Sequence, residues 1–160
     1  MYAAPPLILV IDDDRDVCAL LEELLAEEYR VEIRTTGAAG LARLDAGGVD
    51  LVLLDLRLPD CDGRELCRRV RHWEAELPSH LAIAVVSADD AAIARAASLD
   101  AGADDYVAKP FDLADLLGRV ERALQPRAGT AATGWLADRG HLAPPSTSPG
   151  SSPGERLGSA

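Results

Sequence analysis

Five polar side chains each follow an apolar run of the sequence, at positions where they could act on a phosphoryl group: Asp12, Asp13, Asp55, Ser87 and Lys109. If the three carboxylates converge, each pair repels by roughly 4 kcal/mol at about 4 Å and an effective dielectric constant of ~20. A fold tolerates such repulsion when a cation fills the gap between the oxygens. Mg²⁺ prefers one or two carboxylates together with waters and phosphate oxygens. The pattern therefore predicts a magnesium site suited to phosphoryl transfer.

Asp55 is the best candidate for a nucleophile in this group. It ends a run of residues that are all apolar, and it precedes a turn at residues 56–63. With Mg²⁺ bound, such a carboxylate can attack a phosphoryl group and form an aspartyl phosphate. Phosphoryl transfer depends mainly on positioning and charge neutralisation. We therefore expect the metal, the Lys109 amine and the Ser87 hydroxyl to contact the transferred oxygens.

The elements that must position these side chains follow from the hydrophobic pattern. Continuous or alternating apolar runs predict strands, and apolar residues at helical spacing predict helices between them. The predicted strands lie at residues 7–11, 31–35, 49–54, 81–86 and 105–108. The predicted helices lie at about 17–25, 38–46, 66–73, 90–100 and 112–124. Asp14 is expected to cap the first helix, because aspartate is a preferred N-cap residue.

The regular alternation of strands and helices predicts the fold class. Near-continuous apolar strands indicate a parallel sheet covered on both faces by helices that follow right-handed crossovers. We expect an α/β fold with a doubly wound, five-stranded parallel sheet and five helices. Ligands of such sheets bind beyond the carboxyl ends of the strands, at a switch point in strand order. The polar side chains that follow the strands would then meet at one edge.

Four segments together carry a resemblance to a known family. They are residues 9–13 (LVIDD), 53–59 (LLDLRLP) with Asp62 and Gly63 after them, 86–88 (VSA) and 102–111 (GADDYVAKPF). In this order and spacing, the chain resembles the receiver domain of two-component response regulators over about residues 6–125. The resemblance implies the flavodoxin-like strand order 2-1-3-4-5. Residues 96–124 are most similar to receivers of the winged-helix transcription-factor subfamily. Asp60 departs from the pattern, because the family commonly has glycine in that turn.

The resemblance implies roles for the residues at the predicted edge. Asp55 would be the phosphoacceptor. Asp13 and Asp55 would bind Mg²⁺ directly, with Asp12 beside them and the backbone carbonyl of Arg57 as a further ligand. The bond between Lys109 and Pro110 would be cis, which an X-Pro bond allows at about 0.5–1 kcal/mol.

The resemblance also implies a switch and partners. Tyr106 falls at an aromatic position whose side chain turns inward when the Ser87 hydroxyl is drawn to the phosphoryl group. A sensor histidine kinase or a phosphotransfer protein would supply that group, and a downstream effector protein would read the change. In the winged-helix subfamily, the face made by the fourth helix, fifth strand and fifth helix forms a homodimer.

Composition and charge exclude several other classes. The 160 residues include 27 Asp and Glu against 16 Lys and Arg, a net charge of −11. Such a chain would repel phosphate backbones, so we expect no direct binding of nucleic acid. No apolar run approaches the ~20 residues of a membrane span, so we expect no membrane insertion. Three cysteines without a CxxC pair are typical of free thiols in the cytoplasm.

The sequence predicts a receiver domain at residues 1–125 and a disordered tail at 126–160. The tail contains five Pro, six Gly and five Ser, and it has too few apolar residues to form a core. We expect a stand-alone response regulator that signals to a protein partner and is not an enzyme in its own right. A truncated DNA-binding regulator and a phosphorelay intermediate are alternatives. A Mg²⁺-dependent phosphohydrolase on a related sheet is a further alternative. Such enzymes need an acid two residues beyond the nucleophile, then a Gly-Thr turn and a cap insertion, whereas here Asp12, Asp13 and Asp14 run straight into Arg15 and a helix, and no segment is long enough for a cap.

Overall fold

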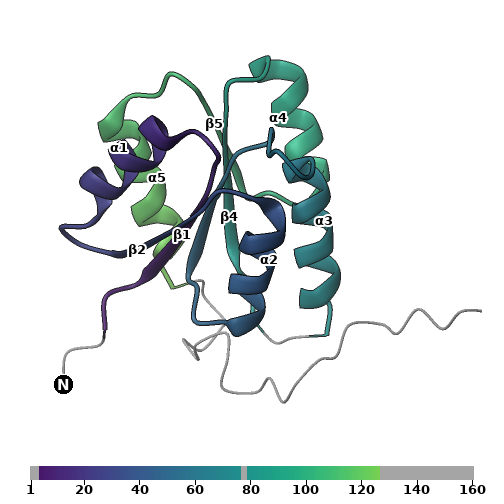
Figure 1. Cartoon of the computed structure of the whole chain (residues 1–160), viewed down its shortest axis with the longest axis horizontal. Coiled ribbons are helices and arrows are strands. Elements are labelled where there is room, and N and C mark those ends of the chain that lie inside the picture. The colour runs from purple at the N-terminus through teal and green to yellow at the C-terminus, as the bar shows by residue number, and fades with distance from the viewer. Residues whose placement is uncertain (1–3, 77–78, 127–160) are drawn as a thin grey trace, which may run out of the picture.

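The computed structural model describes residues 4–76 and 79–126, and the predicted tail beyond Pro126 lies outside the described residues. Strands and helices alternate along the chain as predicted (Figure 1). The elements are β1 (Leu7–Ile11), α1 (Arg15–Leu25), β2 (Arg30–Arg34), α2 (Gly37–Ala46), β3 (Leu51–Leu54), α3 (Gly63–Glu74), β4 (Ala82–Ser87), α4 (Ala91–Asp100), β5 (Asp105–Ala108) and α5 (Leu113–Leu124).

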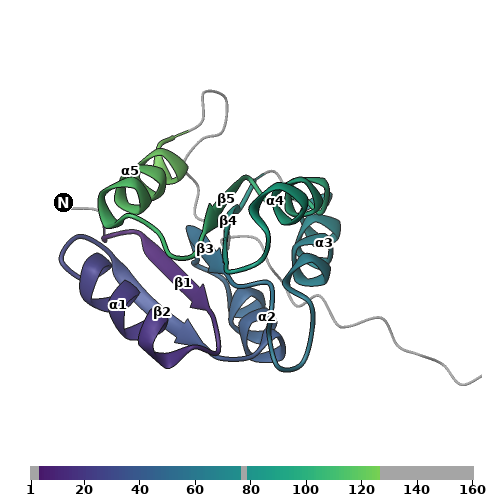
Figure 2. The ribbon, with the colours of Figure 1, turned by 90° about the horizontal axis from the view of Figure 1, so that it is seen from above.

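The sheet has the predicted topology. Its five strands are all parallel and lie in the order β2-β1-β3-β4-β5. Helices α1 and α5 cover one face, and α2, α3 and α4 cover the other (Figure 2). Because every strand points the same way, the side chains that follow the strands share one edge of the sheet, as the sequence pattern required.

Alternation along the central strands divides the core into two layers. In β1, Leu7, Leu9 and Ile11 pack toward the α2–α3–α4 side, while Ile8 and Val10 pack toward the α1–α5 side. This is the two-residue period of a strand that is buried on both faces. The β2 strand lies at an edge of the sheet and is half-buried, in line with its alternating sequence.

The limits of three strands differ from the prediction: β2 is Arg30–Arg34 where 31–35 was predicted, and β4 is Ala82–Ser87 where 81–86 was predicted. The fourth strand extends to Ser87 because its ladder with β5 continues to the pair Ser87–Ala108. The third strand begins at Leu51 and not at residue 49. Asp50 there interacts with the start of β1: its carboxylate accepts from the Leu7 amide at 2.7 Å. A polar residue with a partner of this kind cannot be recognised from the apolar pattern around it.

Each described helix begins with a side chain that caps its first turn. The caps are Asp14, Thr36, Asp62, Asp90 and Asp112. A cap satisfies amides that have no partner within the helix, and its loss costs about 0.5–2 kcal/mol. Asp14 was predicted in this role, and its carboxylate accepts from the Asp16 and Val17 amides.

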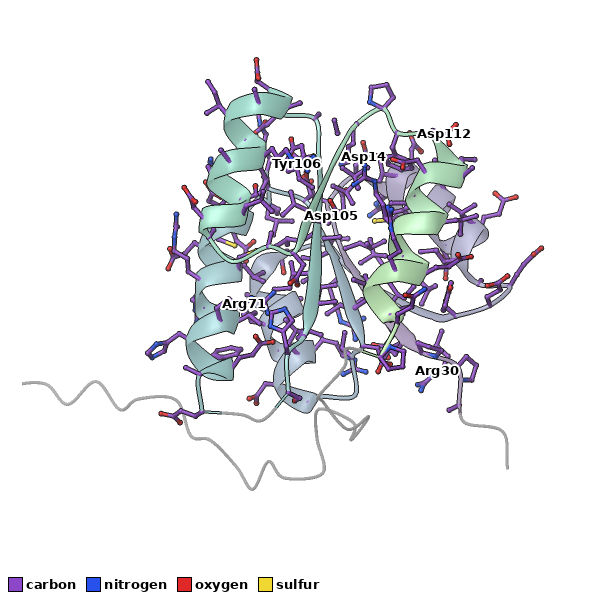
Figure 3. The ribbon with its side chains drawn as sticks, turned by 180° about the vertical axis from the view of Figure 1, so that it is seen from behind. Asp14, Arg30, Arg71, Asp105, Tyr106 and Asp112 are labelled. Atoms are coloured by element: carbon purple, nitrogen blue, oxygen red, sulfur yellow. The ribbon has the colours of Figure 1, made fainter. Side chains whose placement is uncertain are left out.

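Arg71 joins several elements at the end of the molecule opposite the caps. Figure 3 shows Asp14, Tyr106 and Asp112 toward one end and Arg71 toward the other. The Arg71 guanidinium donates to the Leu81 and Gly102 carbonyls, each at 2.7 Å. It also forms ion pairs with Glu74 at 2.7 Å and Asp104 at 2.8 Å. This residue therefore ties α3 to the segments that lead into β4 and β5.

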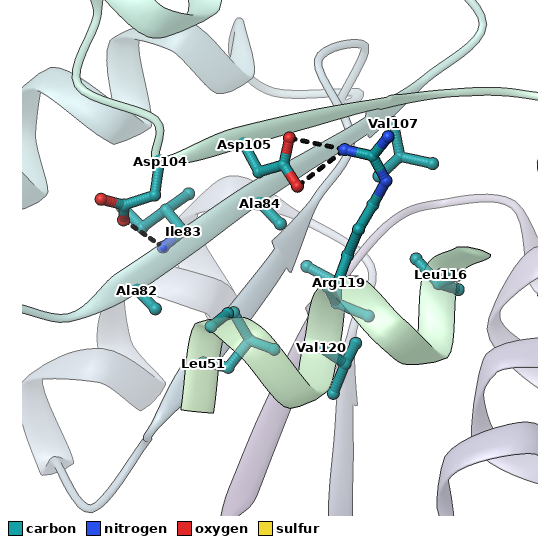
Figure 4. A pocket seen from close by; sticks show the side chains of 12 residues that line it. Leu51, Ala82, Ile83, Ala84, Asp104, Asp105, Val107, Leu116, Arg119 and Val120 are labelled. Atoms are coloured by element: carbon teal, nitrogen blue, oxygen red, sulfur yellow. Dashed lines mark hydrogen bonds and ion pairs between the residues drawn. The ribbon is translucent and has the colours of Figure 1, made fainter. Parts of the chain in front are cut away.

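A small cavity between the sheet and α5 is a packing gap. It measures about 20 Å³ and is lined mainly by apolar side chains, with an ion pair between Arg119 and Asp105 at its rim (Figure 4). The short side chains of Ala82 and Ala84 leave this space under the helix. A volume of this size holds about one water molecule, so the cavity is too small for a ligand.

Gly63 is where the chain after β3 packs most tightly, and its substitution gives a first test. A Cβ at this position would collide with the Asp55 carbonyl oxygen and come within 2.9 Å of the Leu56 Cα. Both contacts are with backbone, so Gly63→Ala should lower the free energy of unfolding by about 1–3 kcal/mol. Urea denaturation followed by circular dichroism measures the change.

Gly118→Ala is the matched control. It lies within α5 and has nothing within 4 Å of an added Cβ. Alanine should therefore raise the stability there by about 0.5–1 kcal/mol, because it favours helix over glycine. Equal effects of the two substitutions would show that the chain is not tightly packed at Gly63.

Candidate functional site

The carboxylates predicted to form a site do converge at the carboxyl edge of the sheet. Asp12 and Asp13 follow β1 and Asp55 follows β3, and one oxygen from each lies within 4.8 Å of the others. The sheet ladder continues one residue past the strands, since the Asp55 amide donates to the Ile11 carbonyl at 2.9 Å. Neighbouring parallel strands therefore hold the first and third carboxylate in register. The crossovers from β1 and β3 lead to opposite faces, which makes this point a switch in strand order.

Lys109 brings a positive charge to this cluster from the end of β5. Its Nζ donates to Asp12 Oδ2 at 2.7 Å and lies 3.6 Å from Asp55 Oδ1. The Lys109 amide donates to the Ser87 carbonyl at 2.8 Å, and the bond to Pro110 is cis, as the resemblance implied. The amine therefore lies between two of the three carboxylates and offsets their repulsion.

Burial and charge shift the proton affinities of this group. Burial raises the pKa of Asp55 and outweighs the lowering by Lys109, while the neighbouring charge of Asp12 raises it further. Burial lowers the pKa of Lys109, but its hydrogen bond to Asp12 and the charges of Asp12 and Asp55 outweigh this, so the net shift is upward. The amine is therefore charged at neutral pH. The fold therefore disfavours the ionised form of Asp55.

The three carboxylates differ in their hydrogen bonds and exposure, and therefore in how each could bind a metal. Both Asp12 oxygens are engaged: Oδ1 accepts from the Asp14 amide at 2.9 Å and Oδ2 accepts from Lys109. Asp13 is exposed, and Asp55 is buried. A set of carboxylate oxygens that is open to solvent on one side fits the ligands that Mg²⁺ prefers. Asp13 and Asp55 would supply direct ligands, with Asp12 holding Lys109 beside them.

The loop between β3 and α3, which begins after Asp55, is ordered by its own backbone contacts. The Gly63 amide donates to the Leu56 carbonyl at 2.8 Å, and Arg57 and Asp62 form an isolated antiparallel bridge. Arg57, whose carbonyl the resemblance assigns to the metal, therefore lies in the part of the loop that this bridge orders. Its exposed guanidinium forms an ion pair with Asp89 of the next loop.

Ser87 and Tyr106 meet at the loop that follows β4. The buried Ser87 hydroxyl accepts from the Asp89 amide at 3.3 Å, and the Tyr106 hydroxyl donates to the Asp89 carbonyl at 3.2 Å. Tyr106 is only 3% exposed, so its ring occupies the inward position. Burial raises the pKa of Tyr106, and the nearby charge of Asp89 adds to this. Asp89 thus connects the Ser87 hydroxyl to the Tyr106 side chain.

Fold and site geometry together define a protein class, and comparison with known proteins agrees with it. The family model of the response regulator receiver domain matches residues 8–121 of the chain. The chain therefore belongs to the response regulator receiver family, as its motifs predicted.

The most similar curated relatives include the response regulator ArlR of Staphylococcus haemolyticus. It is 38% identical over 119 residues, which cover 74% of this chain and 52% of the relative. ArlR of Staphylococcus aureus is 36% identical over the same length. The chain thus spans about half the length of the curated relatives it matches.

Solved structures of receivers are similar along most of the described chain. A putative response regulator from Chloroflexus aurantiacus has 35% identity and a TM-score of 0.69, over 75% of this chain and 98% of that one. DrrB of Thermotoga maritima, an OmpR/PhoB homologue, has 33% identity and a TM-score of 0.66, over 75% of this chain and 52% of that one. These neighbours confirm the fold class. Within the described residues, every helix is too short or too polar to cross a bilayer.

The raised pKa of Asp55 predicts an unusual pH dependence of stability without Mg²⁺. The folded state holds a proton on Asp55 more tightly than the unfolded chain, so stability falls as the pH rises through the raised pKa. At neutral pH the ionised Asp55 therefore destabilises the fold. Asp55→Asn should be more stable than the wild type at pH 7 in EDTA. The difference should vanish below the ordinary pKa of aspartate, as measured by urea denaturation at a series of pH values.

Glu32→Gln is a control with the opposite sign. The hydrogen bonds from Arg43 lower the pKa of Glu32. Its contribution to stability is present above the unfolded pKa and is lost as the pH falls, so Glu32→Gln should destabilise at pH 7. A destabilising effect of Asp55→Asn at pH 7 would contradict the assignment of Asp55 as an unfavourable buried charge.

Proposed function

We propose that this receiver acts in the cytoplasm and accepts a phosphoryl group on Asp55 from a sensor histidine kinase or a phosphotransfer protein. The observation that carries the proposal is the cluster of three carboxylates with the Lys109 amine, held at the carboxyl edge by three different strands. When bound, Mg²⁺ would neutralise the carboxylates and hold phosphoryl oxygens. The protein itself would thus act as a phosphoacceptor in signalling.

Each residue has a distinct part in the proposed transfer. An Asp55 oxygen attacks phosphorus, and the bond from phosphorus to the donor's histidine nitrogen breaks, so the imidazole leaves with the bonding pair. Lys109 contacts an oxygen of the transferred group, because its amine already lies beside Asp55. The Ser87 hydroxyl donates to another oxygen. These contacts place positive charge where negative charge gathers, which is how most phosphoryl transfer is accelerated.

The same residues offer a route for the signal. Moving the Ser87 hydroxyl toward the phosphoryl group would end its hydrogen bond with the Asp89 amide. The Asp89 carbonyl holds the Tyr106 hydroxyl, and its carboxylate holds Arg57. A change at Asp55 would therefore reach the loop before α4 and the face formed by α4, β5 and α5. The signal would be a shift in the population of two arrangements of this loop.

We propose a second copy of the chain as the first partner of the α4–β5–α5 face. A hollow of about 300 Å³ lies there, with Tyr106, Pro110 and Phe111 in its lining and both acidic and basic side chains around it. Ile93 on α4 is 76% exposed, and Leu113 on α5 is 41% exposed. Exposed apolar side chains bordered by charges of both signs suit a self-complementary interface.

The alternative of a phosphohydrolase has less support. In the described chain, α1 begins at Arg15, immediately after the Asp12–Asp14 run. The positions beyond Asp12 and Asp13 therefore serve to begin a helix, with Asp14 as its cap. The expectation that the chain does not bind nucleic acid stays a prediction, as does its identity as a stand-alone regulator.

Phosphorylation of Asp55 is tested with a small donor. Incubation with acetyl phosphate and Mg²⁺ should add the mass of one phosphoryl group to the intact chain. The addition should be absent in EDTA and absent in Asp55→Asn, because the nucleophile is then removed. Asp100→Asn, an exposed residue at the end of α4, should label like the wild type. Intact-protein mass spectrometry measures the result, and equal labelling of Asp55→Asn would overturn the assignment.

The dimer is tested by placing a charge on the exposed apolar surface of α4. Ile93→Glu should weaken self-association of the phosphorylated chain about tenfold or more, since an unpaired charge is unfavourable when an apolar interface buries it. Sedimentation velocity with acetyl phosphate and Mg²⁺ measures association. Leu20→Glu is the matched control, because Leu20 is 40% exposed on α1, away from this face. Equal loss in both variants, or none in Ile93→Glu, would exclude this face.

A further inference from the structure

The Asp60 carboxylate joins two segments that are distant in sequence. Its Oδ1 accepts from the Gly37 amide at 2.7 Å and its Oδ2 accepts from the Ala38 amide at 2.8 Å. These amides begin α2, whereas Asp60 lies in the loop between β3 and α3. The two hydrogen bonds lower the pKa of Asp60. Both oxygens of one side chain are thus directed at a neighbouring helix, which is more than a solvated loop residue requires.

We propose that Asp60 is a positioning residue for phosphoryl transfer, which holds the loop after Asp55 against α2 so that the backbone at Arg57 stays in place. This inference deepens the proposed function and rests on it. The base of the loop is closed by the Gly63–Leu56 hydrogen bond and the Arg57–Asp62 bridge. Asp60 adds a tether at the tip of the loop, two residues before that bridge ends.

Packing between the loop and α2 supports the same role. A Cβ at Gly37 would collide with the Cys61 Sγ and would lie 3.6 Å from a methyl carbon of Leu58. The loop therefore rests directly on the first turn of α2 where that turn has no side chain. At this close approach, Asp60 accepts hydrogen bonds from the first turn of α2, and Cys61 packs against the same turn.

Substitution of Thr36 distinguishes a tether between the loop and α2 from an ordinary helix cap. It is the N-cap of α2, and its hydroxyl accepts from the Ala39 amide at 3.1 Å. That bond is local to the helix and does not reach the loop. Losing it weakens α2 alone, whereas losing the Asp60 carboxylate weakens α2 and also frees the loop. Thr36→Ala is therefore the matched control for Asp60→Ala.

The experiment measures Mg²⁺ binding separately from phosphorylation. Isothermal titration of the unphosphorylated chain with MgCl₂ should give a Kd about tenfold weaker in Asp60→Ala, the low end of what the loss of an outer-shell partner costs. The Mg²⁺ concentration for half-maximal labelling by acetyl phosphate should rise by the same factor. Thr36→Ala should lower the thermal midpoint yet keep the wild-type Kd. Asp60→Asn, with one acceptor oxygen left, should fall between Asp60→Ala and the wild type.

The outcomes distinguish this inference from the proposed function. A wild-type Kd in folded Asp60→Ala, or equally weakened Mg²⁺ binding in Thr36→Ala, would overturn the positioning role. If Asp60→Ala does not fold, the Kd of Asp60→Asn decides in the same way. A wild-type chain that binds Mg²⁺ but is not labelled would refute the phosphoacceptor proposal, while weaker Mg²⁺ binding in Asp60→Ala would still support the tether.

Discussion

Repulsion among three carboxylates at one edge of the sheet constrains the structure around them. Asp12, Asp13 and Asp55 bring their oxygens within 4.8 Å, and the last is buried. The charge that offsets this comes from Lys109, which is more than fifty residues from any of them in the chain. The parallel sheet places the end of β5 at the same edge as the ends of β1 and β3, and from there the amine reaches Asp12 and Asp55.

A series of hydrogen bonds connects this cluster to the loop after β4. Lys109 is joined through its amide to the Ser87 carbonyl, and the Ser87 hydroxyl is joined to Asp89. Asp89 in turn holds Tyr106 and Arg57. Each link uses a backbone group on at least one side or a charged pair. In the proposed function, these contacts would connect Asp55 to the face near α4.

How far the sequence predicts this arrangement depends on the range of each interaction. Strands, helix order and the Asp14 cap depend on neighbours within a few residues, and they were predicted. The role of Asp60 depends on amides more than twenty residues away, and its tether was missed because a turn aspartate after Pro59 has no periodic signal. The Arg71 contacts were missed for the same reason. The site residues themselves could be placed because each follows a strand whose end is readable from apolar composition.

The paired charges around Arg71 and the unfavourable charge of Asp55 lie at opposite ends of the molecule. At the end around Arg71, opposite charges are paired with one another and with carbonyl groups. At the carboxyl edge, by contrast, Asp55 has a pKa that burial raises, so its ionised form works against folding. Residues selected for folding alone would not keep a carboxylate there. A ligand that neutralises Asp55 would recover the free energy that the fold loses by ionising it, which supports Asp55 as the phosphoacceptor of the proposed function.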